Sequence, residues 1–244
     1  MGVEVTDLAP GTQVFGQALG ALADLVVVNR EGVVPLPEGV SLEEGACLGV
    51  AALTAIQAVR TRGQVQPGAN VLITGAAGGV GMFAVQIAKA DGAVVTAETS
   101  PGKLDFVRGL GADRVVAQGD GITRGADRFD VIIDCAGWYP IRKLRRILAG
   151  DGRLVIVGLG TKNPWAVPLG RFAKMPYVRL TSRQTLITFV SGRNQDDLRA
   201  IGELVGSGAV RVHIEHVYPL AQLGAALARL EAREVRGKVV VKLD

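Results

Sequence analysis

The residues with the clearest chemical potential form a glycine-rich turn. Residues 71–81 read Val-Leu-Ile-Thr-Gly-Ala-Ala-Gly-Gly-Val-Gly, so an apolar strand runs directly into a helix predicted over residues 82–90. The first backbone N–H groups of a helix have no intrahelical partner, and the helix dipole is positive there, which favours an anion. Gly78 and Gly79 would let the backbone approach a pyrophosphate, and Gly81 would let the helix pack close to the strand. The pattern predicts dinucleotide binding, and its plain alternative is an ordinary strand-to-helix turn.

A possible ribose acceptor ends the next predicted strand. Glu98 follows Gly78 at the interval of about twenty residues at which dinucleotide-binding sequences place an acidic side chain. A carboxylate there accepts hydrogen bonds from ribose hydroxyls and repels a 2′-phosphate, which favours NADH. Thr99, Ser100 and Lys103 favour NADPH, because they offer two hydroxyls and a cation to that phosphate. The sequence leaves the choice between the two cofactors open.

The elements that must position these residues alternate along the chain. Short apolar strands are predicted at residues 69–74, 93–97, 114–116, 129–135, 154–158 and 178–181, with helices at 82–90, 103–110 and 141–148. Continuous apolar strands between amphipathic helices favour a parallel sheet covered on both faces. The expected fold is therefore α/β, with a doubly wound parallel sheet.

The two ends of the chain have a different pattern. Turn residues surround short segments at 13–15 and 25–29, which suggests antiparallel strands. Toward the other end, helices are predicted at 196–205 and 220–232, and strands at 212–217 and 238–242. The ends therefore do not follow the regular alternation of strands and helices seen in the middle.

Composition excludes several classes of protein. The chain has 244 residues, of which 48% are hydrophobic and 5% aromatic, so it is neither disordered nor collagen-like. Its longest apolar runs fall short of the roughly 20 residues that cross a bilayer, and the start has no signal-peptide pattern. We expect a cytoplasmic protein without a membrane partner. The net charge of +4 suits an anionic ligand without requiring nucleic acid.

The basic residues and the possible metal ligands have ordinary explanations. Four cations, Arg142, Lys143, Arg145 and Arg146, share one predicted helix, which is more typical of a solvated face than of a nucleic-acid site. Cys47 and Cys135 are single cysteines without metal-ligand spacing. His213 and His216 would lie on opposite faces of a strand. We expect no zinc and no nucleic-acid partner.

Five segments in order resemble the medium-chain dehydrogenase/reductase superfamily, closest to its zinc-free, quinone oxidoreductase-like branch. They are residues 9–16, 34–39 with 51–55, 74–81, 131–137 and 236–241. The resemblance implies a Rossmann domain at 46–183, inserted between two parts of a GroES-like catalytic domain at 1–45 and 184–244. Because residues 1–16 match a point well inside the family's first domain, the GroES-like domain is expected to lack its N-terminal part, through a true truncation or a misplaced start.

The resemblance also implies roles for individual residues. Thr54 would lie beside the nicotinamide ring and is the one candidate catalytic residue. The pyrophosphate turn would consist of Ala77, Gly78, Gly79 and Val80. The cofactor ribose would contact Ala136 and Gly137, and the nicotinamide would contact Val157, Gly158 and Leu159. Val50 stands where zinc-dependent relatives carry a cysteine ligand, and Gln118 where relatives carry a tyrosine against adenine.

The implied activity is a zinc-independent transfer of hydride from NAD(P)H to a small molecule, either a quinone or an α,β-unsaturated carbonyl compound. The family favours NADPH, whereas Glu98 favours NADH. A homodimer is possible. The alternative is a catalytically inactive dinucleotide-binding protein that has lost part of the catalytic domain.

Overall fold

The computed structural model describes residues 5–158 and 183–243. The chain forms two compact units, one of residues 54–190 and the other of residues 1–53 together with 191–244. The boundaries expected from the sequence, after residues 45 and 183, both precede these divisions.

The unit of residues 54–190 is built on one parallel sheet. Its strands are β3 (Asn70–Thr74), β4 (Val94–Thr99), β5 (Arg114–Ala117), β6 (Phe129–Asp134), β7 (Leu148–Ile156) and β8 (Thr185–Thr188). Their order is β5-β4-β3-β6-β7-β8, and every neighbouring pair is parallel. The first half of this unit therefore winds outward from β3 in one direction, and the second half winds outward from β6 in the other. This is the doubly wound Rossmann order, with its switch point between β3 and β6, and it confirms the predicted fold class.

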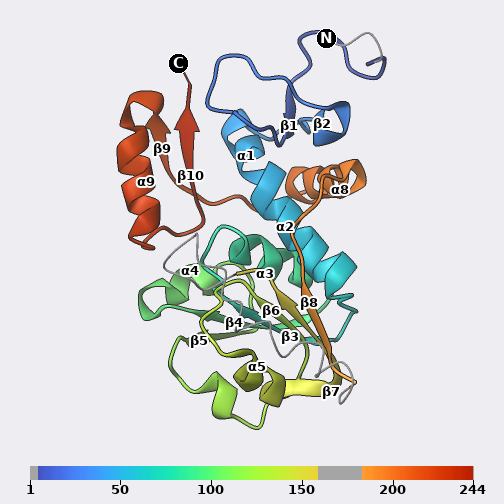
Figure 1. The fold of residues 1–244 in the computed structure, drawn as a ribbon, viewed down its shortest axis with the longest axis vertical. Coiled ribbons are helices and arrows are strands. Elements are labelled where there is room, and N and C mark those ends of the chain that lie inside the picture. Colours follow the sequence, from blue (N-terminus) through green and yellow to red (C-terminus); the bar gives the residue numbers. More distant parts are fainter. Residues whose placement is uncertain (1–4, 159–182, 244) are drawn as a thin grey trace. The chain divides into compact units, whose positions relative to one another are not determined.

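Helices cover both faces of this sheet. Helix α3 (Gly81–Ala90) packs on β3 and β4, α4 (Leu104–Arg108) on β4 and β5, and α5 (Ile141–Ile147) lies on the opposite face (Figure 1). Leu144 and Ile147 of α5 are buried against Leu72, Ile132 and Leu154 of three neighbouring strands. Because both faces are covered, most consecutive residues of the central strands β3, β4 and β6 are buried, which is why these strands appear in the sequence as apolar runs.

The later strands of the sheet differ from the prediction. β7 begins at Leu148 rather than near residue 154, because Leu148 pairs with Phe129 and the ladder then resumes with Arg153 opposite Val131. The intervening residues resemble a turn in sequence, yet the ladder accommodates them as an irregularity. The strand predicted at residues 178–181 lies outside the described residues, and β8 occupies the sixth place in the sheet.

The other unit begins with a small hairpin and a helix. β1 (Val14–Gly16) pairs antiparallel with β2 (Val33–Pro35). The strand predicted at residues 25–29 is wrong, because this segment has no ladder partner in the described chain, and Leu25 is 92% exposed. Helix α1 (Leu42–Cys47) starts with a capping box, in which Ser41 and Glu44 bond each other's backbone N–H.

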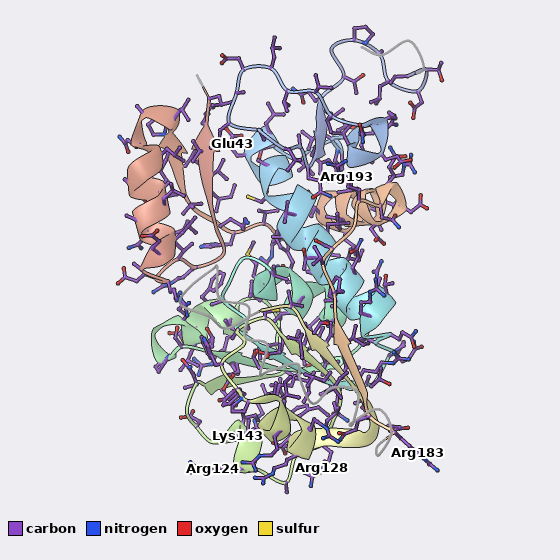
Figure 2. The ribbon with its side chains drawn as sticks, in the orientation of Figure 1. Glu43, Arg124, Arg128, Lys143, Arg183 and Arg193 are labelled. Atoms are coloured by element: carbon purple, nitrogen blue, oxygen red, sulfur yellow. The ribbon has the colours of Figure 1, made fainter. Side chains whose placement is uncertain are left out.

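The C-terminal segment completes this unit. It contains α8 (Gln195–Gly206), β9 (Ile214–Pro219), α9 (Leu223–Glu231) and β10 (Lys238–Lys242). β9 and β10 pair in parallel, with α9 as the connection between them. Lys242 of β10 forms an ion pair of 3.1 Å with Glu43 of α1, which Figure 2 labels. Residues that are nearly two hundred positions apart in the chain thus meet in one unit.

One continuous helical segment joins the two units in the chain. It runs over Leu42–Arg62 through α1, a π-helical stretch Leu48–Ala52, α2 (Leu53–Ile56) and a second π-helical stretch Gln57–Arg62. Its 21 residues and mean hydropathy of 1.3 would suffice to span a membrane, but 67% of its apolar window is buried inside the protein. That burial is the pattern of a core helix.

Candidate cofactor-binding site

The glycine-rich turn lies at the carboxyl end of β3, beside the switch point of the sheet. Gly75 has a φ of +66°, and a Cβ there would lie 3.1 Å from Ala136. A Cβ on Gly81 would lie 2.2 Å from the carbonyl oxygen of Gly75, so α3 can start this close to the strand only with glycine at position 81. Gly78 accepts from the N–H of Met82 and so begins the turn of the helix.

The amide groups of this turn are available to an anion. Within the described part of the chain, the N–H groups of Gly79 and Val80 donate no hydrogen bond. Gly78 is exposed, Gly79 and Val80 are half-buried, and Ala77 is buried. The ten residues of α3 place a positive dipole end at the same point. The turn therefore presents two amide donors and a positive dipole end at one place, and its binding of a pyrophosphate stays a prediction.

A buried aspartate holds the neighbouring loops in place. Asp134, at the end of β6, accepts on Oδ1 from the Thr74 hydroxyl at 2.7 Å and from the N–H of Gly137 at 2.8 Å. Its carbonyl oxygen accepts from the N–H groups of Val157 and Gly158, at 3.0 and 2.9 Å. The ends of β3, β6 and β7 are therefore joined through one residue.

These bonds bring most of the predicted site residues to one edge of the sheet. Gly158 approaches the loop after β6 so closely that a Cβ there would lie 2.1 Å from the carbonyl oxygen of Cys135. Leu159, expected to continue this wall, lies outside the described residues. Asp134 is not among the predicted site residues, although it is a charged residue at the end of an apolar strand, which is a signal in the sequence.

The environment of Glu98 differs from that of an open ribose acceptor. Its exposed fraction is 0%, and Tyr139, in the loop after β6, donates its hydroxyl hydrogen to Oε1 of Glu98. Oε2 is buried without a hydrogen-bond partner among the described residues. Burial raises the pKa of Glu98 to about 7, and the nearby charges of Asp134 and Asp120 act in the same direction, whereas the Tyr139 bond opposes them.

Tyr139 was not identified from the sequence, because nothing in its spacing links it to a glutamate 41 positions away. Its side chain is half-buried. Burial and the bond to Glu98 raise the pKa of the Tyr139 hydroxyl, while the backbone of Gly119 lowers it. Tyr139 thus connects the loop after β6 to the ends of β4 and β5.

The residues that follow Glu98 remain closer to the surface. Thr99 is buried, and its carbonyl oxygen accepts from the N–H of Gln118 at 2.7 Å. Ser100 is half-buried and precedes the short 3-10 turn Pro101–Lys103. The Ser100 side chain does not accept a capping hydrogen bond from the N–H groups of that turn. Lys103 is also half-buried. A hydroxyl and an ammonium group thus lie just beyond the end of β4.

Thr54 lies in α2, between the two π-helical stretches, and is half-buried. Its element is distinct from the loops at the carboxyl edge of the sheet. Short π-helical insertions are frequent at functional sites, which is in keeping with the expected role but does not establish it. The roles of Thr54 and of the other site residues remain predictions.

The potential metal ligands do not gather in the described part of the chain. No group of three His, Cys, Asp or Glu side chains there could hold an ion. Cys47 is buried, and burial raises its pKa to about 11. The strand predicted at residues 212–217 contained both histidines. The observed strand β9 begins at Ile214, so it includes His216 and leaves His213 just before its start.

The cations of α5 are largely solvated. Arg142, Lys143 and Arg146 are exposed, and Arg145 donates to the side chain of Gln184 at 3.0 Å. Figure 2 shows Lys143 at the same end of the unit as Arg124 and Arg128. This arrangement is that of a solvated basic surface, the ordinary explanation favoured by the sequence.

Comparison with known proteins places the chain in a family. Residues 110–241 match the family model described as zinc-binding dehydrogenase. The chain is 29% identical to a trans-enoyl reductase of Aspergillus terreus, over 99% of this chain and 72% of the relative. It is 31% identical to a mitochondrial NAD(P)H oxidoreductase of Homo sapiens, over 99% of this chain and 67% of the relative.

A solved structure agrees with these sequence relatives. The quinone oxidoreductase from Coxiella burnetii matches with a TM-score of 0.86 at 26% identity, and the match covers 100% of this chain and 76% of that one. The fold, the glycine turn and these relatives together show that the chain belongs to the medium-chain dehydrogenase/reductase superfamily, in its quinone oxidoreductase-like branch.

Proposed function

We propose that this protein is an oxidoreductase that uses NAD(P)H to reduce a quinone or an α,β-unsaturated carbonyl compound without zinc. The observation that carries the proposal is the glycine turn with two unpaired amides at the start of α3, beside the switch point of the sheet. Dinucleotides bind at this place in doubly wound folds. The names of the relatives, a trans-enoyl reductase and a quinone oxidoreductase among them, support the substrate class.

The residues present fit a nicotinamide dinucleotide. The amides of Gly79 and Val80 and the α3 dipole would hold the pyrophosphate, and Ala136 and Gly137 would pass the ribose. Val157, Gly158 and Thr54 would orient the nicotinamide, whose hydride is the chemistry that the cofactor supplies when bound. Asp134 would act as a positioning residue, because it fixes the loops on which these groups lie.

Zinc independence is supported by the side chains at the expected ligand positions. Val50 offers no donor atom to a metal, and the thiol of Cys47 is held in its protonated form by burial. Thiolates, rather than thiols, bind zinc.

The test begins with binding. Titration of the protein with NADH and with NADPH, followed by nucleotide fluorescence, should saturate at one site per chain. Oxidation of whichever reduced nucleotide binds is then measured with a panel of quinones and enones, with and without a metal chelator. Gly81→Ala, in which the added Cβ disrupts the turn, should abolish binding, whereas Gly224→Ala, in open space on α9, should not change it.

Three results are distinguishable. Binding with consumption that a chelator does not reduce supports the proposal. Binding without consumption of any acceptor favours the alternative of a dinucleotide-binding protein without turnover. Failure to bind either cofactor refutes the assignment of the turn.

A further inference from the structure

The buried carboxyl of Glu98 has an unusual arrangement for a residue at the end of the second strand of a doubly wound sheet. Its Oε1 is bonded by Tyr139, its Oε2 has no partner among the described residues, and none of the side chain is exposed. A buried acceptor left without a donor is costly and rare, so it calls for an explanation. One explanation is that Oε2 acquires a partner in another state of the protein.

The groups around Glu98 differ in the contacts that hold them. On β6, Asp134 is fixed by bonds to Thr74 and Gly137, and on the sheet itself Glu98 is held in register opposite Thr74. Asp120, after β5, contributes a negative charge but no bond to Glu98. Tyr139 lies in a loop, is half-buried, and makes the single hydrogen bond to the carboxyl in the described chain. Tyr139, which also packs against the buried cluster that contains Leu144, is therefore the one side-chain donor to this carboxyl among the described residues.

While Tyr139 stays in place, a ribose diol cannot reach the carboxyl. Ser100 and Lys103 follow the end of β4, and both are partly accessible. A hydroxyl and an ammonium group suit a phosphate ester, whereas a ribose hydroxyl gains most from a carboxylate acceptor. The covered arrangement thus lacks the feature that selects NADH and keeps the features that select NADPH.

We propose that Tyr139 is a specificity-determining gate that withholds Glu98 from the adenosine ribose, so that the protein selects NADPH, and that its removal admits NADH. The inference rests on the proposed function, since it requires a bound dinucleotide. The proposal assigns the choice between NADH and NADPH to Tyr139 as well as to the acidic residue Glu98. Tyr139 and Glu98 act as one unit, and neither alone sets the preference.

The test measures the dissociation constants of NADH and NADPH for the wild type, Tyr139→Ala and Tyr139→Leu, each checked for a cooperative thermal transition. Leucine keeps apolar packing beside α5 but has no hydroxyl, so it serves if alanine destabilises the loop. Uncovering the carboxylate should tighten NADH at least about tenfold relative to NADPH, the size expected of one charge-assisted hydrogen bond. Tyr218→Phe, which removes a hydroxyl in the other unit, should leave the ratio unchanged.

A double variant separates the gate from a general loosening of the site. Glu98→Gln combined with Tyr139→Leu should lose the gain in NADH affinity, because the carboxylate that accepts the ribose is gone. If both single variants at position 139 bind the cofactors with the wild-type ratio, or if the wild type already prefers NADH, the gate is refuted. If the wild type binds neither cofactor, it is the proposed function that fails.

Discussion

Replacing Glu98 with glutamine should change how the stability of the unit of residues 54–190 depends on pH. Burial raises the pKa of this carboxyl from an ordinary 4.5 to about 7 in the folded protein. Between these values the folded state keeps a proton that the unfolded chain has lost. The raised pKa therefore contributes stability below about pH 4.5, and that contribution is lost as the pH rises through 7.

The size of the effect follows from the shift. A shift of roughly 2.5 units, at about 1.36 kcal/mol per unit, corresponds to about 3 kcal/mol. Glutamine has a similar shape, can accept the Tyr139 hydroxyl hydrogen and does not titrate. The difference in unfolding free energy between wild type and Glu98→Gln should therefore change by about 3 kcal/mol between pH 4.5 and 8, in favour of glutamine at the higher pH.

The assay is urea unfolding across this pH range, followed by tryptophan fluorescence. Both tryptophans of the chain, Trp138 and Trp165, belong to residues 54–190, so the signal reports the relevant unit. Asp105→Asn is the matched control, because the side chain of Asp105 is 96% exposed and should leave the pH dependence nearly unchanged.

A second variant tests the cause of the shift. Tyr139→Phe removes the bond that lowers the pKa of Glu98, so the loss of stability should extend to higher pH. If the unfolding free energies of wild type and Glu98→Gln change in parallel with pH, the raised pKa of the buried Glu98 carboxyl is refuted.

Three further predictions concern the rest of the fold. Asp134→Ala should lower the free energy of unfolding by about 2 to 5 kcal/mol in urea, because the buried Thr74 hydroxyl and the Gly137 N–H lose their acceptor. Asp134→Asn keeps Oδ1 and should lower it clearly less, so equal losses of stability in the two variants would contradict this role. Gly81→Ala should lower the melting temperature, because its Cβ would lie 2.2 Å from the Gly75 oxygen, whereas Gly224→Ala should raise it slightly; a Gly81→Ala protein as stable as wild type would disprove the close approach. Ser41→Ala should destabilise the other unit by about 1 kcal/mol through loss of the capping box, and an unchanged unfolding curve would show that the cap is unimportant.

The doubly wound sheet and the glycine turn could both be predicted from the amino-acid sequence. Both follow from local rules: apolar strands that are buried on both faces have no polar alternation, and a helix can start tight against a strand only where side chains are absent. Gly81 illustrates the second rule, since its neighbours leave no room for a Cβ. The short strand expected at residues 25–29 failed because apolar, β-branched residues make a strand only where a partner strand pairs with them.

The burial and the hydrogen bonds of the chemically important side chains could not be predicted, because they depend on contacts between distant segments. The spacing of Glu98 indicated an acidic group at the end of β4, but spacing along one strand cannot show that a tyrosine from the loop after β6 covers it. The role of Asp134 likewise appears only when three strand ends meet. Strand order brings together residues that are distant in the chain, and burial then sets which of them stay charged or accessible, so the surroundings of Glu98 are a property of the folded edge rather than of any one segment.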